Sequence, residues 1–146
     1  MAINDEQLQE MACKELETLK DNLIDFLEKN YNKPYELDCR VKTPEKLREK
    51  QKLMNYSSII ACKDIIGFRI SVDSEDEVLE LSRLVESLGP NSVVDYFNKP
   101  RETGFKAFLY YFELDINTEI QIMTKEMKEW TNKTHDEHNK RKYGHR

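Results

Sequence analysis

Hydrophobic side chains recur every three to four residues along several stretches of the chain, which is the pattern of helices that bury one face. Thr43-Pro44 is a favourable helix start and Gly89-Pro90 a favourable stop. We expect four helices, over residues 4–29, 43–55, 73–88 and from about residue 124 onward. Leu88 and Trp130 are among the side chains expected to be buried.

The stretches between these helices either alternate in polarity or are rich in β-branched and aromatic residues, as strands are. Asn117 separates the last two of them, which indicates a hairpin. We expect strands or strand-like segments over residues 35–41, 63–71, 91–97, 105–114 and 119–122. The second, the following helix and the third form a predicted strand–helix–strand unit. The order of elements predicts an α+β fold with a small mixed sheet and helices packed on it.

Residues 63–71 would suit a buried central strand, yet the stretch carries Asp64 and Arg69. Burying an unpaired charge costs on the order of several kcal/mol. Strict alternation places Asp64 on the face of Ile66, and Gly67 on the face of Arg69. Gly67 would let another group approach closely. The stretch is therefore either a strand with a structural ion pair or a strand that faces a metal or ligand.

Composition limits the functions to consider. The 146 residues are 38% hydrophobic and 35% charged, which fits one soluble domain, residues 1–146, with one core. The net charge of −5 argues against a large nucleic-acid surface. No apolar run approaches the roughly 20 residues of a membrane span, and the first residues lack a signal-peptide pattern. The odd number of cysteines (Cys13, Cys39 and Cys62) indicates reduced thiols, so we expect a cytoplasmic protein without membrane contact.

Positive charge nevertheless gathers in one segment. Between Lys33 and Lys52 there are seven Lys or Arg residues and four Asp or Glu residues. Such a segment is either a solvated basic face or a place where an anion such as phosphate binds. The carboxylates of Asp64 and Glu119, on separate strands, are ligands that Mg²⁺ accepts together with substrate phosphates.

Four segments resemble the synthetase domain of the RelA/SpoT family, the alarmone synthetases that transfer pyrophosphate from ATP to the 3′ hydroxyl of GDP or GTP. The matching segments are Arg40-Val41-Lys42 with Lys50, residues 63–70, residues 95–106, and residues 119–122 with Thr124, Trp130, His135-Asp136 and Lys140. The resemblance implies a nucleotidyltransferase-like mixed β-sheet of about five strands flanked by helices. It also implies a catalytic core over residues 36–140, preceded by an N-terminal helix over residues 1–30.

The resemblance implies a role for each matching residue. Asp64 and Glu119 would bind Mg²⁺, the implied cofactor, and would form the catalytic set with Gln121, which would lie near the attacking hydroxyl. The residues implied to bind ATP are Arg40, Lys42, Lys46, Lys50 and Arg69. The residues implied to bind the acceptor are Lys99, Arg101, Phe105 and Lys106.

The chain departs from the family pattern at Lys46 in the ATP-binding helix, and also at Ala107, Leu109, Met123 and Asn139, so the ATP half is better kept than the acceptor half. Three functions therefore stay open. The first is pyrophosphate transfer from ATP to GDP or GTP. The second is a toxin-type transferase that acts on the 3′ end of tRNA or on another nucleotide, with an antitoxin as a candidate partner. The third is a nucleotide-binding module without turnover. The oligomeric state is open.

Overall fold

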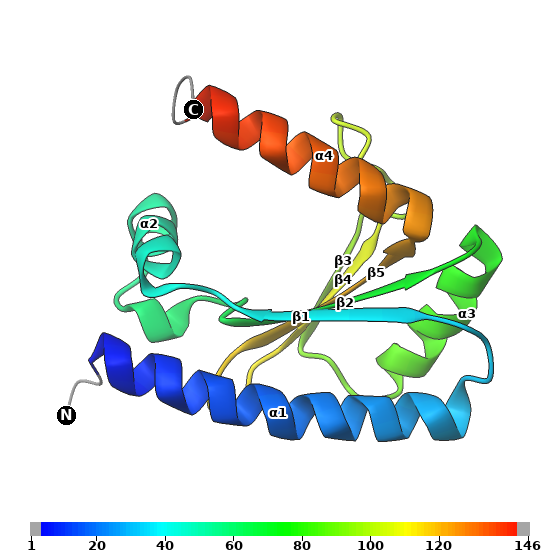
Figure 1. Cartoon of the computed structure of the whole chain (residues 1–146), viewed down its shortest axis with the longest axis horizontal. Coiled ribbons are helices and arrows are strands. Elements are labelled where there is room, and N and C mark those ends of the chain that lie inside the picture. The colour runs from blue at the N-terminus through cyan, green and yellow to red at the C-terminus, as the bar shows by residue number, and fades with distance from the viewer. Residues whose placement is uncertain (1–3, 143–146) are drawn as a thin grey trace.

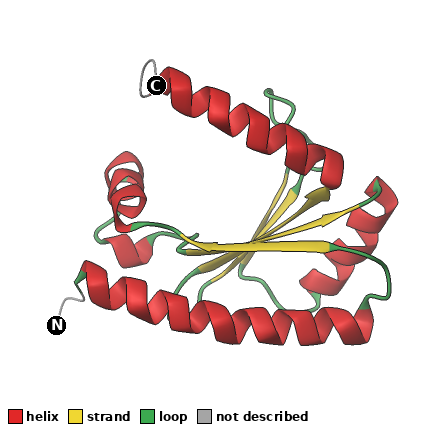
Figure 2. Ribbon diagram, viewed as in Figure 1, coloured by secondary structure: helices red, strands yellow, loops and turns green. Residues whose placement is uncertain are grey.

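The computed structural model describes the backbone of residues 4–142 and the side chains of residues 4–134. Within that part of the chain, a five-stranded sheet is flanked by four α-helices and one short 3₁₀ helix (Figures 1 and 2). The elements are α1 (Asp5–Asn30), β1 (Glu36–Val41), α2 (Pro44–Met54), η1 (Ile59–Ala61), β2 (Ile66–Val72), α3 (Glu75–Glu86), β3 (Ser92–Asp95), β4 (Phe108–Phe112), β5 (Thr118–Thr124) and α4 (Lys125–Lys142). The predicted fold class is confirmed.

Side-chain caps explain why the helices begin where the sequence predicts. The Asn4 side chain accepts a hydrogen bond from the Gln7 backbone N–H, and the Gln7 side chain accepts one from the Asn4 backbone N–H, so the two cap α1 reciprocally. Thr43 caps α2 in the same position. Helix α3 ends at Glu86, earlier than expected, and Leu88 therefore lies beyond it with 41% of its surface exposed, so its predicted burial is wrong.

The strand order of the sheet is β1-β2-β5-β4-β3. Strand β2 pairs antiparallel with β1 and parallel with β5, while β4 pairs antiparallel with both β5 and β3. The predicted hairpin is thus confirmed as β4–β5. The predicted strand–helix–strand unit is β2–α3–β3, but its two strands are not neighbours, because β5 and β4 lie between them.

The two faces of the sheet differ in chemistry. Helices α1 and α3 cover one face and share a single hydrophobic core with it, in which Phe68, Ile70, Tyr110 and Ile122 are buried. Helices α2 and α4 lie on the opposite side of the sheet from α1 (Figure 1). Among the described residues, no helix is both long enough and apolar enough to cross a membrane.

Candidate active site

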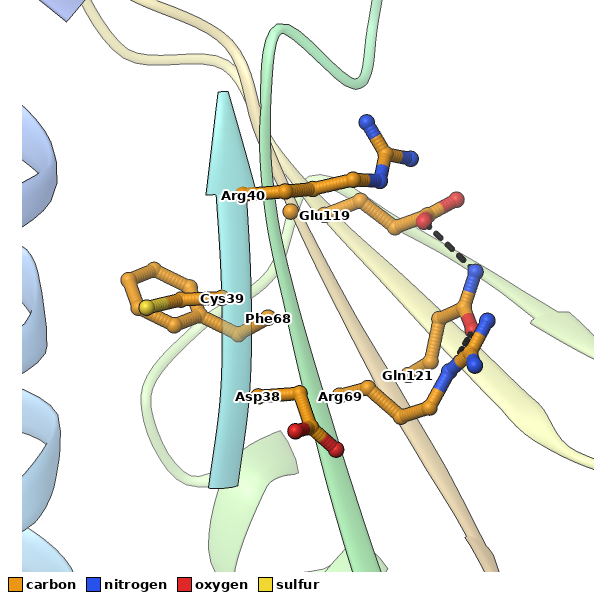
Figure 3. A pocket seen from close by; sticks show the side chains of 8 residues that line it. Asp38, Cys39, Arg40, Phe68, Arg69, Glu119 and Gln121 are labelled. Carbon is orange, nitrogen blue, oxygen red and sulfur yellow. Dashed lines mark hydrogen bonds between the residues drawn. The ribbon is translucent and has the colours of Figure 1, made fainter. Parts of the chain in front are cut away.

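The face of the sheet that α2 and α4 flank carries charged side chains from three adjacent strands. Backbone pairing sets Arg40 beside Gly67 and Gly67 beside Glu119, and it sets Arg69 beside Gln121. Arg40, Arg69, Glu119 and Gln121 extend to one side of the strands, as Figure 3 shows. They line a cavity of about 140 Å³, which we call the polar cavity.

Gly67 makes room for a side chain from the neighbouring strand. A Cβ atom at this position would lie 3.3 Å from Cζ of Arg40, closer than side chains normally pack. The close approach predicted at Gly67 is therefore the Arg40 guanidinium, which crosses the glycine on its way to the polar cavity.

Asp64 lies in the turn before β2, which begins only at Ile66. The prediction that Asp64 shares the face of Ile66 is wrong, because strand alternation does not extend into that turn. Asp64 is 5% exposed, and three cations surround its carboxylate. Its Oδ2 lies 2.7 Å from Nζ of Lys42 and 3.6 Å from Arg40, and its Oδ1 lies 3.4 Å from Nζ of Lys50.

These neighbours determine the charge states at the turn. Burial would raise the pKa of Asp64, but the hydrogen bond from Lys42 and the charges of Lys42, Lys50 and Arg40 outweigh it, so the pKa falls below its ordinary value. Burial lowers the pKa of Lys42 more than Asp64 raises it. One ionised carboxylate facing three basic groups leaves a local excess of positive charge, which favours binding of an anion.

A chain of hydrogen bonds fixes Gln121 between Arg69 and Glu119. Arg69 Nε donates to Gln121 Oε1 at 3.0 Å, and Gln121 Nε2 donates to Glu119 Oε1 at 2.8 Å (Figure 3). Arg69 also donates to Asn132 of α4 at 3.2 Å. The Gln121 amide can satisfy both neighbours in only one orientation, so the 5%-exposed Glu119 carboxylate is held in place.

Tyr111 joins this group from β4, although no role was predicted for it. It is the direct cross-strand partner of Glu119. Burial, then the charge of Glu119 and a hydrogen bond to it, raise the pKa of the Tyr111 hydroxyl well above its usual range, and the charge of Asp64 adds to the effect. Both carboxylates therefore lie near enough to this hydroxyl to raise its pKa. Alternation alone shows that only one of Tyr110 and Tyr111 can face this side, and the strand register identifies which.

The donor atoms suit a hard divalent cation such as Mg²⁺. Asp64 Oδ1 is buried without a hydrogen-bond donor, although Lys50 lies nearby, so it has a lone pair for a metal. Among the described residues, no three His, Cys, Asp or Glu side chains converge on one point. An ion held by Asp64 and Glu119 would thus take its other ligands from phosphate and water, as Mg²⁺ commonly does.

The side chains predicted to bind ATP do not all converge. Arg40, Lys42 and Lys50 meet at Asp64, and Arg69 lines the polar cavity next to them. Lys46 is exposed, and within the described part of the chain its side chain forms no hydrogen bond or ion pair. Its predicted role in ATP binding stays a prediction that these contacts do not strengthen.

The side chains predicted to bind the acceptor lie away from the polar cavity, in or near the segment before β4. The Arg101 guanidinium lies 5.3 Å from the ring centre of Tyr96, and Phe105 meets the same ring edge-on at 6.0 Å. Lys106 pairs with Glu75 at 2.8 Å, while Lys99 is exposed. Phe105 and Lys106 precede β4 although they were expected within a strand, since pairing with β5 begins only at Phe108.

Three departures from the family pattern lie together in the structure. Ala107, Leu109 and Met123 form a small buried apolar cluster on the same face as Glu119, with Phe105 and Tyr111 packed around it. Leu109 is the cross-strand partner of Gln121. The part of this face that the resemblance assigns to the acceptor is therefore apolar, and it lies next to the polar side chains of Glu119 and Gln121.

Trp130 borders a second cavity, of about 280 Å³, between α4 and the segment before β4. Its predicted burial in the core is wrong, because 36% of its surface is exposed. The indole instead packs at the surface, where a Cβ at Gly104 would lie 3.8 Å from it. The side chains of His135, Asp136, His138, Asn139 and Lys140, and the rest of the basic tail, lie outside the described residues.

Comparison with known proteins identifies the family. The family model described as "Region found in RelA / SpoT proteins" matches residues 39–146. The chain belongs to the RelA/SpoT family. It is accordingly a pyrophosphotransferase of this family, as the resemblance of its motifs implied. A search of curated protein sequences finds no significant match.

Solved structures of this family share the fold. A GTP pyrophosphokinase family protein from Streptococcus pneumoniae is similar at 23% identity and a TM-score of 0.78, over 96% of this chain and 79% of that one. Small alarmone synthetase 1 from Bacillus subtilis bound to its product pppGpp is similar at 23% identity and a TM-score of 0.73, over 88% and 76% of the two chains. The Type VI effector Tas1, solved in complex with its immunity protein, is similar at 16% identity and a TM-score of 0.67, over 87% and 66%.

Proposed function

We propose that this RelA/SpoT-family chain transfers pyrophosphate from ATP to the 3′ hydroxyl of GDP or GTP. The observation that carries the proposal is the arrangement around Asp64, where three cations surround one buried carboxylate beside the polar cavity that Glu119 lines. That arrangement suits a triphosphate bound through cations and a metal.

In this proposal Lys42 and Lys50 hold the ATP phosphates, and Arg40 and Arg69 enclose the adenine from two adjacent strands. Guanidinium groups suit that role, because they are planar and stack on aromatic rings. Bound Mg²⁺, held by Asp64 and Glu119, would neutralise phosphate charge as the reaction proceeds.

The acceptor 3′ oxygen attacks the β-phosphorus of ATP, the bond from that phosphorus to the oxygen it shares with the α-phosphate breaks, and AMP leaves. Glu119 accepts the proton of the hydroxyl, and Gln121 holds Glu119 in position for it. Positioning and charge neutralisation are the main requirements of phosphoryl-group chemistry, and this face supplies groups for both.

The test is a transfer assay with labelled ATP, Mg²⁺ and GDP or GTP. We expect labelled tetra- or pentaphosphate from the wild type, and a loss of at least about a hundredfold in Asp64→Asn and Glu119→Gln. Asp21→Asn, on an exposed part of α1, is the control and should be fully active. Full activity of the Asp64 and Glu119 variants would refute the roles given to both carboxylates.

A second candidate keeps the reaction and changes the acceptor to the 3′ end of tRNA or another nucleotide. The apolar cluster of Ala107, Leu109 and Met123 favours it, because these departures from the family pattern fall in the half of the site that the resemblance assigns to the acceptor. The structural similarity to the effector Tas1 gives it further support, and an antitoxin-like protein would then be a partner. Running the same assay with tRNA and other nucleotides separates the two candidates.

Tight binding of ATP without transfer to any acceptor would instead indicate a nucleotide-binding module without turnover. A cytoplasmic location stays a prediction.

A further inference from the structure

Arg69 is held by two hydrogen bonds that come from different elements of the fold. Its Nε donates to Gln121 Oε1 of β5 at 3.0 Å, and its Nη1 donates to Asn132 Oδ1 of α4 at 3.2 Å. Gln121 belongs to the catalytic set that the family resemblance implies, whereas no step of the reaction proposed above uses Asn132. The second bond therefore connects a helix outside the sheet to a side chain that lines the polar cavity.

The Arg69 side chain needs such support because it lies near another cation. Burial and then the charge of Arg40 lower the pKa of Arg69, although the guanidinium keeps its proton. The charges of Asp38 and Glu119 act in the opposite direction, but among the described residues neither carboxylate forms an ion pair with Arg69. Direct pairing thus does not offset the repulsion between the two arginines, and hydrogen bonds set the place of Arg69.

Both groups that accept these hydrogen bonds are neutral amides, which leave the charge of Arg69 uncancelled. With the Nε bond alone the guanidinium could swing about that bond, whereas a second bond at Nη1 fixes the orientation of the rigid, planar group. The N–H bonds of a guanidinium lie in its plane, so neither acceptor covers the face on which an aromatic ring stacks. The arrangement suits a guanidinium that presents one face to a ring.

Ion pairs of α4 keep Asn132 within reach of Arg69. Lys128 lies one helical turn before Asn132 and on the same side of the helix. Its Nζ lies 2.7 Å from Asp38 and 3.4 Å from Glu36 of β1. Asp38 is in turn the cross-strand partner of Arg69. The two α4 side chains therefore contact the sheet at one point, on neighbouring strands.

We propose that Asn132 is a positioning residue for ATP binding, which holds the Arg69 guanidinium against the repulsion of Arg40 in the orientation in which its face stacks on adenine. The inference rests on the proposed function, because that function supplies adenine as the ring between the two arginines. It adds α4 to the elements that form the ATP site, and Asn132 acts only through Arg69.

Calorimetry with ATP and Mg²⁺, without an acceptor, measures the effect on binding alone. Asn132→Leu keeps much of the side-chain volume but removes the acceptor oxygen. We expect this variant to bind ATP about fivefold more weakly than the wild type, because the lost hydrogen bond has a charged donor but is exposed to water. Lys133→Leu places the same side chain at the next, exposed position of α4 and should bind ATP as the wild type does.

Further variants show whether Asn132 acts through Arg69. Asn132→Asp keeps an acceptor oxygen at the same distance from the backbone, so its affinity for ATP should lie within about twofold of the wild type. Arg69→Ala should weaken ATP binding about tenfold. Adding Asn132→Leu to Arg69→Ala should cost no further affinity, since two side chains that act as one unit are not additive.

Inorganic tripolyphosphate shows whether the effect comes from the adenine or from the phosphates. It carries the phosphate chain without a base, so in the presence of Mg²⁺ it should bind equally well to Asn132→Leu and to the wild type. In the transfer assay Asn132→Leu should raise KM for ATP about fivefold and leave kcat unchanged, because a stacked base is bound equally in the ground state and the transition state. A general displacement of α4 would instead change kcat and tripolyphosphate binding as well.

Unchanged ATP affinity of Asn132→Leu, an equal loss of tripolyphosphate affinity, or a further loss in the Arg69→Ala background would each overturn the assignment. It would also fall if Asn132→Asp bound ATP as weakly as Asn132→Leu. Failure of the proposed function looks different, since ATP would bind the variants in the predicted order while no label reaches GDP or GTP. A wild type that binds neither ATP nor tripolyphosphate would refute both proposals.

Discussion

At the scale of single residues, adjacent tyrosines of β4 face opposite sides of the sheet and allow a matched comparison. Tyr111 is paired with Glu119 on the polar face, whereas Tyr110 is fully buried in the core and donates to Glu86 at 3.2 Å. We expect Tyr111→Phe to lower the transfer rate about tenfold with little loss of stability, because Glu119 loses one of the two groups that hold it.

Tyr110→Phe should show the reverse, a loss of about 1 kcal/mol of stability and an unchanged transfer rate. Transfer kinetics and denaturant unfolding of the two variants provide the comparison. Equal transfer rates in Tyr111→Phe and the wild type would show that Gln121 alone suffices to position Glu119.

A substitution at Gly67 should likewise affect the stability of the chain and its affinity for ATP differently. A methyl group at this position would press on the Arg40 guanidinium, whose side chain is 47% exposed and can move away. Alanine is more favourable than glycine in a strand interior by about 0.5–1 kcal/mol. We therefore expect Gly67→Ala to fold at least as stably as the wild type but to bind ATP several-fold to about tenfold more weakly, since Arg40 is displaced from the polar cavity. Thermal unfolding and calorimetry with ATP measure the two effects, and unchanged ATP affinity would argue against a role for Arg40 in binding.

At the scale of elements, ion pairs hold α4 against the edge of the sheet. Lys128 lies 2.7 Å from Asp38 and 3.4 Å from Glu36 of β1, and Lys125 lies 3.0 Å from Asp73. Because Asn132 of the same helix binds Arg69, the position of α4 is linked to that of a predicted ATP-binding group.

Removing the Lys128 pair should loosen α4. We expect Lys128→Ala to raise hydrogen exchange across α4 by up to about fivefold, the effect of roughly 1 kcal/mol, and to leave α1 unchanged. Lys133→Ala, an exposed lysine on the same helix, is the control for helix propensity. Exchange in α4 that is the same in both variants would show that the Lys128 ion pairs do not hold the helix.

The sequence was sufficient to predict most elements, because their signals are local. Capping residues and hydrophobic periodicity located α1 and α2 closely, and the hairpin followed from two β-rich stretches around Asn117. Strand order is not a local property. The parallel pairing that sets Gly67 beside Glu119, and hence the whole polar face, could be expected only through the family resemblance.

The errors have the same physical origin. Alternation places Asp64 correctly only if the strand includes it, and the end of a strand depends on which backbone groups find partners on its neighbours. Trp130 occupies an apolar position of a helix, but no sequence pattern shows that the surface opposite it is a cavity wall. Asp64, Glu119 and Arg40 were singled out from motifs, whereas the place of Tyr111 beside Glu119 needed the tertiary structure.

At the scale of the whole molecule, three tyrosines link folding to pH. The hydroxyls of Tyr31, Tyr110 and Tyr111 each lie near a carboxylate, those of Glu77, Glu86 and Glu119 respectively. Burial first, and then the neighbouring negative charge, raises the pKa of each tyrosine above its ordinary value. Each group therefore binds its proton more tightly in the folded chain than in the unfolded chain.

Proton linkage then fixes the sign of the pH dependence. The stability that these groups contribute is fully present below the unfolded pKa of about 10, and it is lost as pH rises above that value, because only the unfolded chain releases the protons. We expect the free energy of unfolding to fall by at least about 1 kcal/mol per pH unit above about pH 10. Denaturant unfolding at a series of alkaline pH values measures the slope. Tyr110→Phe removes one of the three groups, so the free energy of unfolding of this variant should fall less steeply with pH. An equal slope in the variant and the wild type would assign the alkaline instability to other groups, such as the lysines.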